Sequence, residues 1–222
     1  MHPHPFVAYR PPRLADGEMQ RRADAFRDAM AVRRSVRHFS PDAVPRELVE
    51  AAVATAASAP SGANRQPWRF VVVGDPAVRR RIREAAEREE RENYEGGRLP
   101  EDWLEALRPL GTWWQKPYLE VAPWLVIVFE ERYAVGPDGE QIKNYYVKES
   151  VGIACGLFIA ALHQMGLATV PHTPSPMAFL RRELGRPVNE RAFALFPVGH
   201  PASDCEVPDL RRKSLDEVMV AV

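Results

Sequence analysis

Apolar and polar residues follow a helical period in several stretches of the chain. Apolar positions three or four residues apart predict helices over residues 17–32, 45–59 and 101–115. A long apolar helix is expected from about Tyr145, and a short helix over residues 176–184. Helices therefore make up much of the predicted secondary structure.

One further helix has an unusual end. Asp75 can cap it, Pro76 fits its first turn, and an apolar ridge at every fourth residue follows, formed by Val78, Ile82 and Ala86. The ridge then enters the almost wholly charged segment 87–94, where it continues through Glu90 and Tyr94. Because residues four apart share a helix face, a carboxylate and a phenol lie together on the inward side. Their pairing is either chance or the mark of a ligand.

Short runs rich in β-branched and aromatic residues between the helices are typical of buried strands. Such runs occupy residues 69–73, 123–129, 167–170 and 193–199, and segment 136–139 predicts a turn. The order of helices and strands lacks the regular alternation of a doubly wound sheet. The pattern therefore predicts a mixed α+β fold.

The bulk composition excludes some classes of partner. A chain of 222 residues suits one domain, large enough to bury a core around a cofactor. Its 30 Lys and Arg residues are balanced by 30 Asp and Glu residues, so no whole-chain field favours nucleic acid. A nucleic-acid-binding module is the weakest alternative, because the basic clusters are short and are offset by acids.

Residues 150–170 carry no formal charge and approach the length of a membrane span. Internal glycines and polar residues, without asymmetric basic flanks, favour a buried core helix instead. Residues 1–14 contain prolines and no long apolar run, which predicts an arm and neither a signal peptide nor a membrane anchor. Cys155 and Cys205 form no metal, redox or disulfide pattern, so a cytoplasmic location is expected.

Two basic clusters are candidate anion sites. Residues 33–37 hold three guanidinium groups and a hydroxyl, which suit a phosphate because Arg binds its oxygens through paired donors. Taken alone, this cluster is more often a solvated basic turn, and the cluster at 211–213 leaves the same two readings open. Residues 61–63 offer a hydroxyl and accessible backbone donors to a flat ligand, or form only a turn.

The familiar catalytic motifs are missing from the sequence. It contains no GxSxG elbow, no HExxH, no metal-type pairing of Cys with His, no GxGxxG after a strand and no P-loop. His2 and His4 are interpreted as residues of the N-terminal tail. Any chemistry is therefore expected to belong to a cofactor.

Eight segments from Arg33 to the C-terminal region together resemble one family. They are RRSVR (33–37), APSGANRQPW (59–68), EERENY (89–94), WWQKPYL (113–119), SVGIACG (150–156), GLATV with HTP (166–170 and 172–174), FPVGHP (196–201) and VPDLRRKSLDEVMV (207–220). The chain is similar to the iodotyrosine deiodinases, within the FMN-dependent nitroreductase superfamily. RRSVR alone marks the superfamily, whereas the set of Glu90, Tyr94 and Lys116 distinguishes the deiodinases inside it.

This resemblance implies an α+β, nitroreductase-like sandwich that forms an intertwined homodimer, with FMN at the subunit interface. Residues 1–32 are then an N-terminal arm and first helix, and residues 33–222 form a single FMN domain. Within that domain the resemblance implies a lid over about 88–116 and a C-terminal arm over about 206–222.

The resemblance also implies a set of cofactor-binding residues. Those implied to hold the phosphate and polar edge of FMN are Arg33, Arg34, Ser35, Arg37 and Arg212. Pro60 and Ser61 would line the flavin, and Pro171, His172 and Thr173 would run along its ring. Thr173 is the implied catalytic residue, since its hydroxyl would bond flavin N5 and favour one-electron chemistry. His172 departs from the small hydroxyl residue expected beside it, and its titratable ring either affects the pH profile or points away.

For the substrate, the resemblance implies a halotyrosine zwitterion held by the lid. Its ammonium calls for a carboxylate and its carboxylate for a cation, which Glu90 and Lys116 supply. Tyr94 would donate to the substrate carboxylate, and the Ala63 backbone amide would stabilise the phenolate oxygen. The aromatic ring would stack on the flavin while the lid excludes water.

The expected activity is FMN-dependent reductive dehalogenation of halotyrosines, with iodotyrosine giving tyrosine and iodide. Electrons are expected from an external flavin reductase or another NAD(P)H-derived source. One alternative is a general nitroreductase or quinone reductase that uses NAD(P)H directly. An alternative of another class is a non-catalytic protein that binds FMN or a tyrosine derivative. No nucleic acid, membrane or metal partner is expected.

Overall fold

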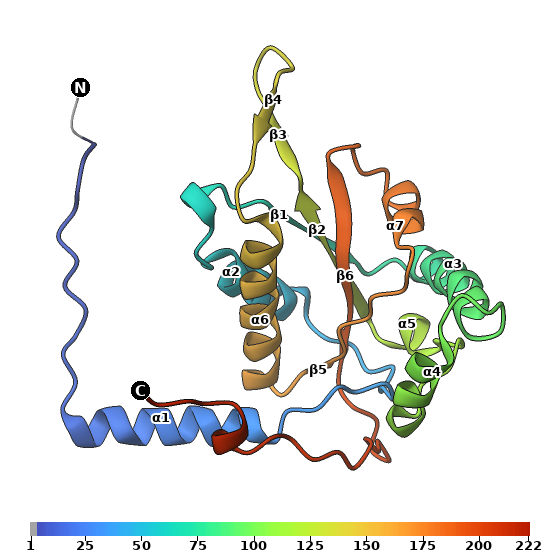
Figure 1. Ribbon diagram of the computed structural model, residues 1–222, viewed down its shortest axis with the longest axis horizontal. Helices are drawn as coiled ribbons and strands as arrows, with labels where there is room; N and C mark the ends of the chain where they lie inside the picture. The colour runs from blue at the N-terminus through green and yellow to red at the C-terminus, as the bar shows by residue number, and fades with distance from the viewer. Residues whose placement is uncertain (1–3) are drawn as a thin grey trace. The chain divides into compact units, whose positions relative to one another are not determined.

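The computed structural model describes residues 4–222, so the first three residues of the predicted arm, with His2, lie outside it. The chain divides into two compact units, one ending at Arg33 and the other formed by Arg34–Val222. The first unit holds an extended segment and helix α1, Asp16–Ala31 (Figure 1). The helix predicted there is confirmed to within one residue. None of its described residues is buried, and Phe26 is 55% exposed.

The second unit is built on a four-stranded antiparallel sheet in the order β1-β2-β6-β5 (Figure 1). Its strands are β1 Trp68–Val73, β2 Trp124–Glu131, β5 Ala168–Thr169 and β6 Glu190–Gly199. All four predicted strands are present. Three β-branched residues end β1, and every residue of β2 from Leu125 to Glu130 is buried, as expected for a central strand.

Helices cover both faces of this sheet, because strand side chains alternate between the faces. Leu125, Ile127 and Phe129 of β2 pack in one core cluster with α3 (Pro76–Tyr94), α5 (Tyr118–Val121) and α7 (Ala178–Glu183). Val126 and Val128 pack in the other cluster with α2 (Arg46–Ala57) and α6 (Val147–Gln164). Figure 1 shows the two helical layers on opposite sides of the sheet. The predicted α+β sandwich is confirmed.

The helix predicted over residues 101–115 is too long. Helix α4 spans Glu101–Leu107 and passes into a 3-10 turn, η2, over Arg108–Leu110. Pro109 lacks the N–H that a continuing helix needs, and Gly111 adopts a positive φ of 59°, which ends the turn. Trp103 was expected to point inward but is 55% exposed. The turn at 136–139 was predicted without its flanking strands, β3 (Tyr133–Val135) and β4 (Gln141–Lys143).

Helix α6 is buried along one face only. Val151, Phe158 and Leu162 lie in the core, whereas Gly152 and Gly156 are exposed and Ile153 is 47% exposed. The predicted core helix is therefore confirmed along its buried face, and its other face is open in the described chain. Across residues 4–222, we find no helix with the length and apolar character needed to span a membrane.

Candidate active site

Helix α3 turns two polar side chains, those of Glu90 and Tyr94, toward the core. The Asp75 carboxylate caps it by accepting from the amides of Ala77 (2.7 Å) and Val78 (3.1 Å). Ile82 and Ala86 follow on the ridge at 0% exposure, which fixes the rotation of the helix. One turn after Ala86 on the same ridge, Glu90 is only 7% exposed. One turn further along, Tyr94 is half-buried. The predicted inward carboxylate and phenol are therefore present.

Lys116 meets these groups from the loop two residues before α5. Its side chain is 2% exposed, and Nζ lies 3.3 Å from Oε2 of Glu90. Nζ also donates to Thr112 Oγ1 (3.1 Å) and to the Trp113 carbonyl. Burial lowers the pKa of Lys116, and the nearby Glu90 carboxylate opposes that shift. The ammonium is therefore a poorly hydrated cation with few anionic partners.

Tyr94 completes this cluster. Its ring lies 5.1 Å from the Lys116 ammonium and 5.0 Å from the Trp113 ring, measured between centroids for the two rings. Burial raises the pKa of Tyr94, and a hydrogen bond with Thr112 acts against the rise. The phenol therefore keeps its proton and can donate it in a hydrogen bond at neutral pH.

These three side chains line a cavity of about 190 Å³. The cavity is also lined by Arg37 and the segment that follows β5, and its remaining walls come from residues 93–112 and α5. Lining residues from the predicted site are Arg37, Glu90, Tyr94, Lys116, Pro171, His172 and Thr173. The structure thus places three of the implied substrate residues, Glu90, Tyr94 and Lys116, beside part of the implied cofactor set.

The segment after β5 presents alternate side chains to opposite sides. The backbone of His172 pairs with Leu195 of β6, donating at 2.8 Å and accepting at 2.9 Å. Pro171 and Thr173 are exposed, whereas His172 is 8% exposed and turned toward the core. Its Nδ1 lies 3.4 Å from the Tyr118 hydroxyl. Burial lowers the pKa of His172 to about 3, helped by Lys116 and Arg37, so the ring is neutral.

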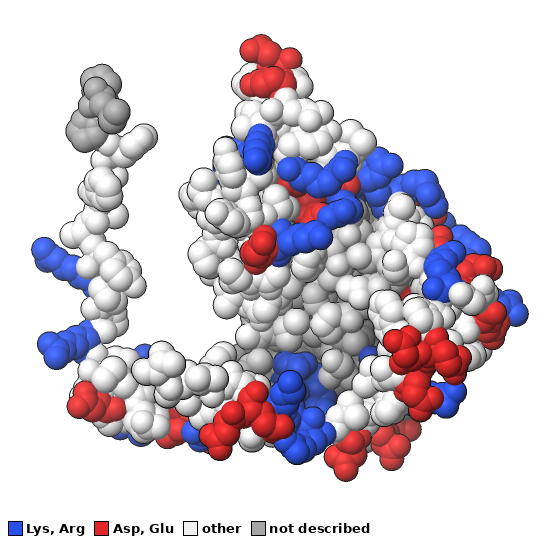
Figure 2. All heavy atoms as spheres, in the orientation of Figure 1, with Lys and Arg blue, Asp and Glu red and all other residues white. Residues whose placement is uncertain are grey.

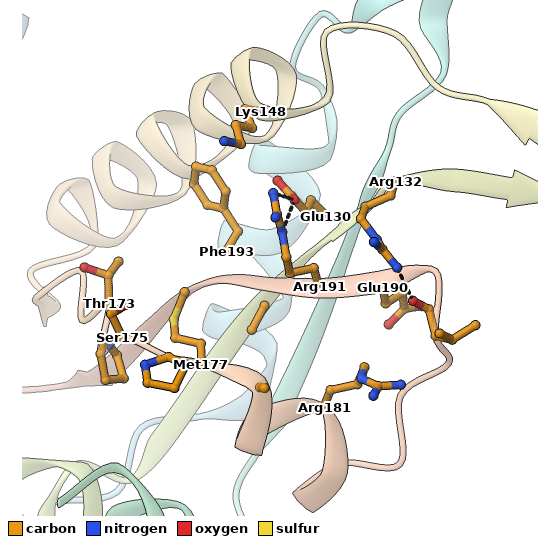
Figure 3. Close-up of a pocket in the computed structure, with 15 residues that line it drawn as sticks. Glu130, Arg132, Lys148, Thr173, Ser175, Met177, Arg181, Glu190, Arg191 and Phe193 are labelled. Atoms are coloured by element: carbon orange, nitrogen blue, oxygen red, sulfur yellow. Dashed lines mark hydrogen bonds and ion pairs between the residues drawn. The ribbon is translucent and has the colours of Figure 1, made fainter. Parts of the chain in front are cut away.

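A larger cavity of about 640 Å³ adjoins the first (Figure 3). Thr173 and Ser175 line both cavities. In the larger one, Arg191 donates to Glu130 at 2.6 Å. No carboxylate from the described residues lies within 4.0 Å of the Lys148 ammonium there. Because Thr173 lines both cavities, its side chain is accessible to a ligand in either one.

The basic segment at 34–37 lies next to β5. The backbone of Ser35 forms an isolated parallel β-bridge with Thr169, and the Arg34 guanidinium donates to the Pro208 carbonyl. In the described chain, neither Arg34 nor Arg37 forms an ion pair with a carboxylate. Figure 2 shows basic and acidic side chains interspersed over much of the visible face of the second unit. The uncompensated guanidinium groups fit an anionic or electron-rich ligand.

Arg33 and Arg212 are the other basic residues of the predicted set. Arg33 is the last residue of the first unit, so its placement relative to the cavity is not described. Arg212 is exposed on the C-terminal arm, which turns once as η3, Leu215–Glu217.

Pro60, Ser61 and Ala63 lie elsewhere. They follow α2 and form the 3-10 turn η1, Gly62–Asn64, where the Gly62 amide donates to Ser150 of α6 at 3.2 Å. A Cβ on Gly62 would lie 2.6 Å from the Tyr145 carbonyl oxygen, so this close approach requires glycine. Neither of the two cavities is lined by these residues. One chain therefore does not bring the whole predicted set to one place.

Thr112 and Tyr118 are among the cavity residues that the sequence prediction missed. Thr112 accepts a hydrogen bond from Lys116, and the Tyr118 hydroxyl lies 3.4 Å from Nδ1 of His172. Tyr118 stands in the quoted segment WWQKPYL, two residues after Lys116, which is a weak signal that could have identified it. Thr112 precedes that segment and has no local pattern.

Comparison with known proteins agrees with this architecture. Residues 30–200 match the model of the nitroreductase family. An iodotyrosine deiodinase of Haliscomenobacter hydrossis is 54% identical over 97% of this chain and 96% of its own length, and one of Danio rerio is 47% identical over 98% and 74%. A crystal structure of oxidised iodotyrosine deiodinase bound to FMN and 3-iodo-L-tyrosine is 33% identical, with a TM-score of 0.73 over 86% of this chain and 96% of that one. This chain therefore belongs to the nitroreductase family and, within it, to the iodotyrosine deiodinases.

Proposed function

We propose that this protein is an FMN-dependent enzyme that removes iodide reductively from iodotyrosine. The observation that carries this proposal is the shared cavity of Glu90, Tyr94 and Lys116 with the segment 171–173. A general reductase of nitroaromatic compounds would have no need for a buried carboxylate and ammonium at that place.

The residues present fit FMN. Arg34 and Arg37 have no carboxylate partner in the described chain, and the exposed Thr173 side chain lines both cavities. Arg33, Arg34, Ser35 and Arg212 would hold the phosphate, and Arg37 the polar edge of the flavin. Pro171 and His172 would support the ring, and the Thr173 hydroxyl would donate toward N5 as the catalytic residue. FMN, when bound and reduced, supplies two electrons.

The charged pair would recognise the amino-acid part of the substrate. Glu90 and Lys116 contact one another at 3.3 Å, and the incoming zwitterion would place its ammonium at Glu90 and its carboxylate at Lys116. Tyr94 would donate its O–H to the same carboxylate. Four charges of alternating sign would then replace two, in a site with little water.

The proposed reaction balances with two electrons and one proton for each iodide released. The carbon–iodine bond breaks, a carbon–hydrogen bond forms with a proton that comes ultimately from solvent, and iodine leaves as iodide. The two electrons come from the reduced cofactor. The chain's own contribution is to orient the ring through the zwitterion contacts and to exclude water when residues 88–116 close as a lid.

A homodimer would complete the site. Pro60, Ser61 and Ala63 line neither cavity, so a second copy would have to supply the flavin contacts of the first two and the Ala63 amide. Helix α6 offers a face for that contact, since Gly152, Ile153 and Gly156 are exposed together. We include FMN at the subunit interface in the proposal for this reason.

The electron source and the compartment also belong to the proposal. An external flavin reductase or another NAD(P)H-derived donor would reduce the cofactor. Both cysteines are free, which suits a reducing cytoplasm. Cell fractionation with an antibody against the protein would test the compartment.

Titration of the FMN-loaded protein with 3-iodotyrosine, followed by flavin fluorescence, tests the proposed recognition. Tyrosine and nitrobenzene serve as controls. The proposal expects strong quenching by iodotyrosine and weak or no response to the controls. Equal responses to all three compounds would instead favour a general nitroreductase.

A further inference from the structure

Lys116 is held at both ends by carboxylates of α3. Its ammonium lies 3.3 Å from Oε2 of Glu90, and its backbone amide donates to Oε1 of Glu87 at 2.7 Å. Glu87 and Glu90 are three residues apart on the helix, so their side chains share a face. The proposed substrate contacts use Glu90 and give Glu87 no role. The Glu87 contact with the Lys116 backbone is therefore a separate feature of the site.

Glu87 is itself fixed by an ion-pair network. Its Oε2 lies 2.6 Å from Nη1 of Arg83, one turn earlier on α3. Nε of Arg83 donates to Oε2 of Glu120 at 2.7 Å, and Nε of Arg80 donates to the other oxygen of Glu120 at 3.0 Å. The Glu87 and Arg83 side chains are only 15% and 23% exposed, so their pair is less screened by solvent than a surface pair. Glu87 therefore has one oxygen on Arg83 and the other directed at Lys116.

The same network fastens the chain that follows Lys116. Glu120 belongs to α5, four residues further on, and the Lys116 carbonyl accepts from the Leu119 amide at 3.0 Å as that helix begins. Arg79 of α3 also donates to the Glu120 carbonyl at 2.6 Å and to the Ala122 carbonyl. The backbone from Lys116 onward is thus attached to α3 at several points.

The chain that precedes Lys116 differs in burial. No residue from 95 to 115 is buried, whereas the Lys116 side chain is 2% exposed. A segment with few buried contacts opens at low free-energy cost, and a buried, hydrogen-bonded one does not. The Glu87 contact lies at the residue where the chain passes from the first kind to the second.

We propose that Glu87 is a positioning residue that fixes the Lys116 backbone to α3, so that the lid opens over residues 95–115 while the Lys116 ammonium stays in the site. The inference rests on the proposed function, which assigns the substrate carboxylate to Lys116. A cation already in place need not be ordered when the substrate arrives, and the apparent affinity falls with the fraction of molecules in which the site is assembled. Glu87 therefore supports recognition of the carboxylate without touching the ligand.

The first test compares two ligands of the FMN-loaded protein by flavin fluorescence: 3-iodotyrosine, and 3-iodotyramine, which lacks the carboxylate. The ratio of their affinities isolates the part of binding that depends on Lys116. Glu87→Leu removes the acceptor and should lower this ratio about tenfold, the loss expected for one charge-assisted hydrogen bond. Glu87→Gln should retain more of the ratio, because its amide oxygen can still accept from the Lys116 amide. An unchanged ratio in Glu87→Leu, or an equal loss in both variants, would overturn the proposal.

Glu84→Leu is the matched control. Glu84 lies three residues before Glu87 on α3, is exposed, and also pairs with Arg83, at 3.6 Å. Its replacement removes a carboxylate from the same network, and the affinity ratio should remain that of the wild type. A similar drop in this control would show that any loss of charge around Arg83 acts on the site, and would disprove a specific role for Glu87.

Hydrogen exchange measured by NMR gives a readout independent of activity. In the FMN-loaded protein without substrate, the Lys116 amide should be protected while amides of residues 96–111 exchange rapidly. Glu87→Leu should speed exchange at Lys116 by about tenfold or more and leave the buried half of α6 unchanged, which separates a local effect from general destabilisation. Exchange at Lys116 as fast as in the lid of the wild type would contradict the anchor.

Lys116→Met separates this inference from the proposed function. In the Lys116→Met protein, Glu87→Leu should have no further effect on the affinity ratio, because both changes act through one ammonium; a further drop would contradict the inference. If Lys116→Met lowers the ratio while Glu87→Leu does not, recognition by Lys116 stands and the positioning role is disproved. If Lys116→Met leaves the ratio unchanged, the placement of the substrate carboxylate at Lys116 fails, and the inference fails with it.

Discussion

At the scale of single residues, Glu90 and Lys116 are the basis of the proposal that the cavity binds a zwitterion. Each is almost fully buried, and their side chains lie 3.3 Å apart. A ligand with one charge would satisfy one of them and leave the other buried with weaker compensation, which is costly. A halotyrosine carries an ammonium group and a carboxylate group on one carbon atom. We therefore expect the pair to select amino acids over neutral aromatic compounds.

Replacing Glu90 with Gln should weaken binding of 3-iodotyrosine by about tenfold or more, because the substrate ammonium loses its counterion. FMN should stay bound. The flavin-fluorescence titration measures both effects. Glu92→Gln is the control, since Glu92 lies on the same helix but is exposed and forms no ion pair among the described residues. Unchanged affinity in Glu90→Gln would remove Glu90 from the substrate site.

His172 predicts how stability depends on pH. Its folded-state pKa is about 3, below the value of about 6.5 expected for an unfolded chain. Between these values the unfolded chain binds a proton that the folded chain does not, so stability is full above the unfolded pKa and falls with pH toward the folded one. From pH 7 to pH 4.5, the wild type should lose roughly 2 kcal/mol more than His172→Asn.

Denaturant unfolding of both proteins at the two pH values, with equal FMN concentrations, gives this difference. Identical losses in the two proteins would mean that His172 is protonated in the folded state, or is not buried in solution.

Several site residues could be predicted from local pattern and others could not. Glu90 and Tyr94 follow from the four-residue ridge of a capped helix, which fixes the direction of each side chain. Thr112 and Tyr118 lie in irregular or very short elements, so no periodicity indicates where they point. Their roles depend on tertiary contacts with Lys116 and His172.

At the scale of elements, the segment between α3 and α5 is the least anchored part of the site. No residue from 95 to 115 is buried, and α4 has no buried side chain. A hydrogen bond from Trp114 to Glu95 (2.8 Å) lies within the segment, and one from Arg98 to Glu89 (3.1 Å) holds it to α3, both through exposed groups. Such a segment opens at low free-energy cost.

Hydrogen exchange should therefore detect the lid. Amides of residues 96–111 should exchange rapidly in the FMN-loaded protein and slow by about tenfold or more when 3-iodotyrosine is added. Amides in the buried half of α6 provide the internal control and should not change. Equal exchange of the lid with and without 3-iodotyrosine would contradict substrate-dependent closure.

The sequence located most elements but not all their ends. Strands β1, β2 and β6 were predicted because central strands are continuous apolar runs. The end of α4 was missed because the apolar period runs on through Pro109 and Gly111, whose backbone limits decide the outcome. The β3 and β4 strands were not predicted, because each has three residues and little apolar pattern.

At the scale of the whole molecule, the described chain leaves apolar surface uncovered. Along the exposed face of α6, Ile153 is 47% exposed, and in the C-terminal arm Val218 and Val220 are 66% and 87% exposed. Pro60, Ser61 and Ala63 stand apart from the cavities. Burial of these surfaces against a second copy would account for both observations.

Ile153→Lys should convert the FMN-loaded dimer to monomers and weaken FMN binding by about tenfold or more, because a charge would be buried at the proposed contact. Light scattering after gel filtration measures the mass, and flavin fluorescence measures retention. Val121→Lys is the control, since Val121 is 41% exposed on α5. A wild-type protein that is monomeric and retains FMN would disprove the dimeric site.

The fold class and family could be predicted from the sequence because eight separate segments agreed, and both are confirmed. The separation of η1 from the cavities could not be predicted, because no local pattern tells whether η1 and segment 171–173 of one chain lie together. That relation depends on how α6 and the sheet pack.

The central claim is tested most directly by a single turnover without oxygen. FMN-loaded protein, reduced with dithionite and freed of excess reductant, is mixed with 3-iodotyrosine, and iodide, tyrosine and flavin absorbance are measured. We expect one iodide and one tyrosine for each reduced FMN, with the flavin returning to its oxidised spectrum. Flavin that stays reduced, with no iodide released despite bound 3-iodotyrosine, would contradict it.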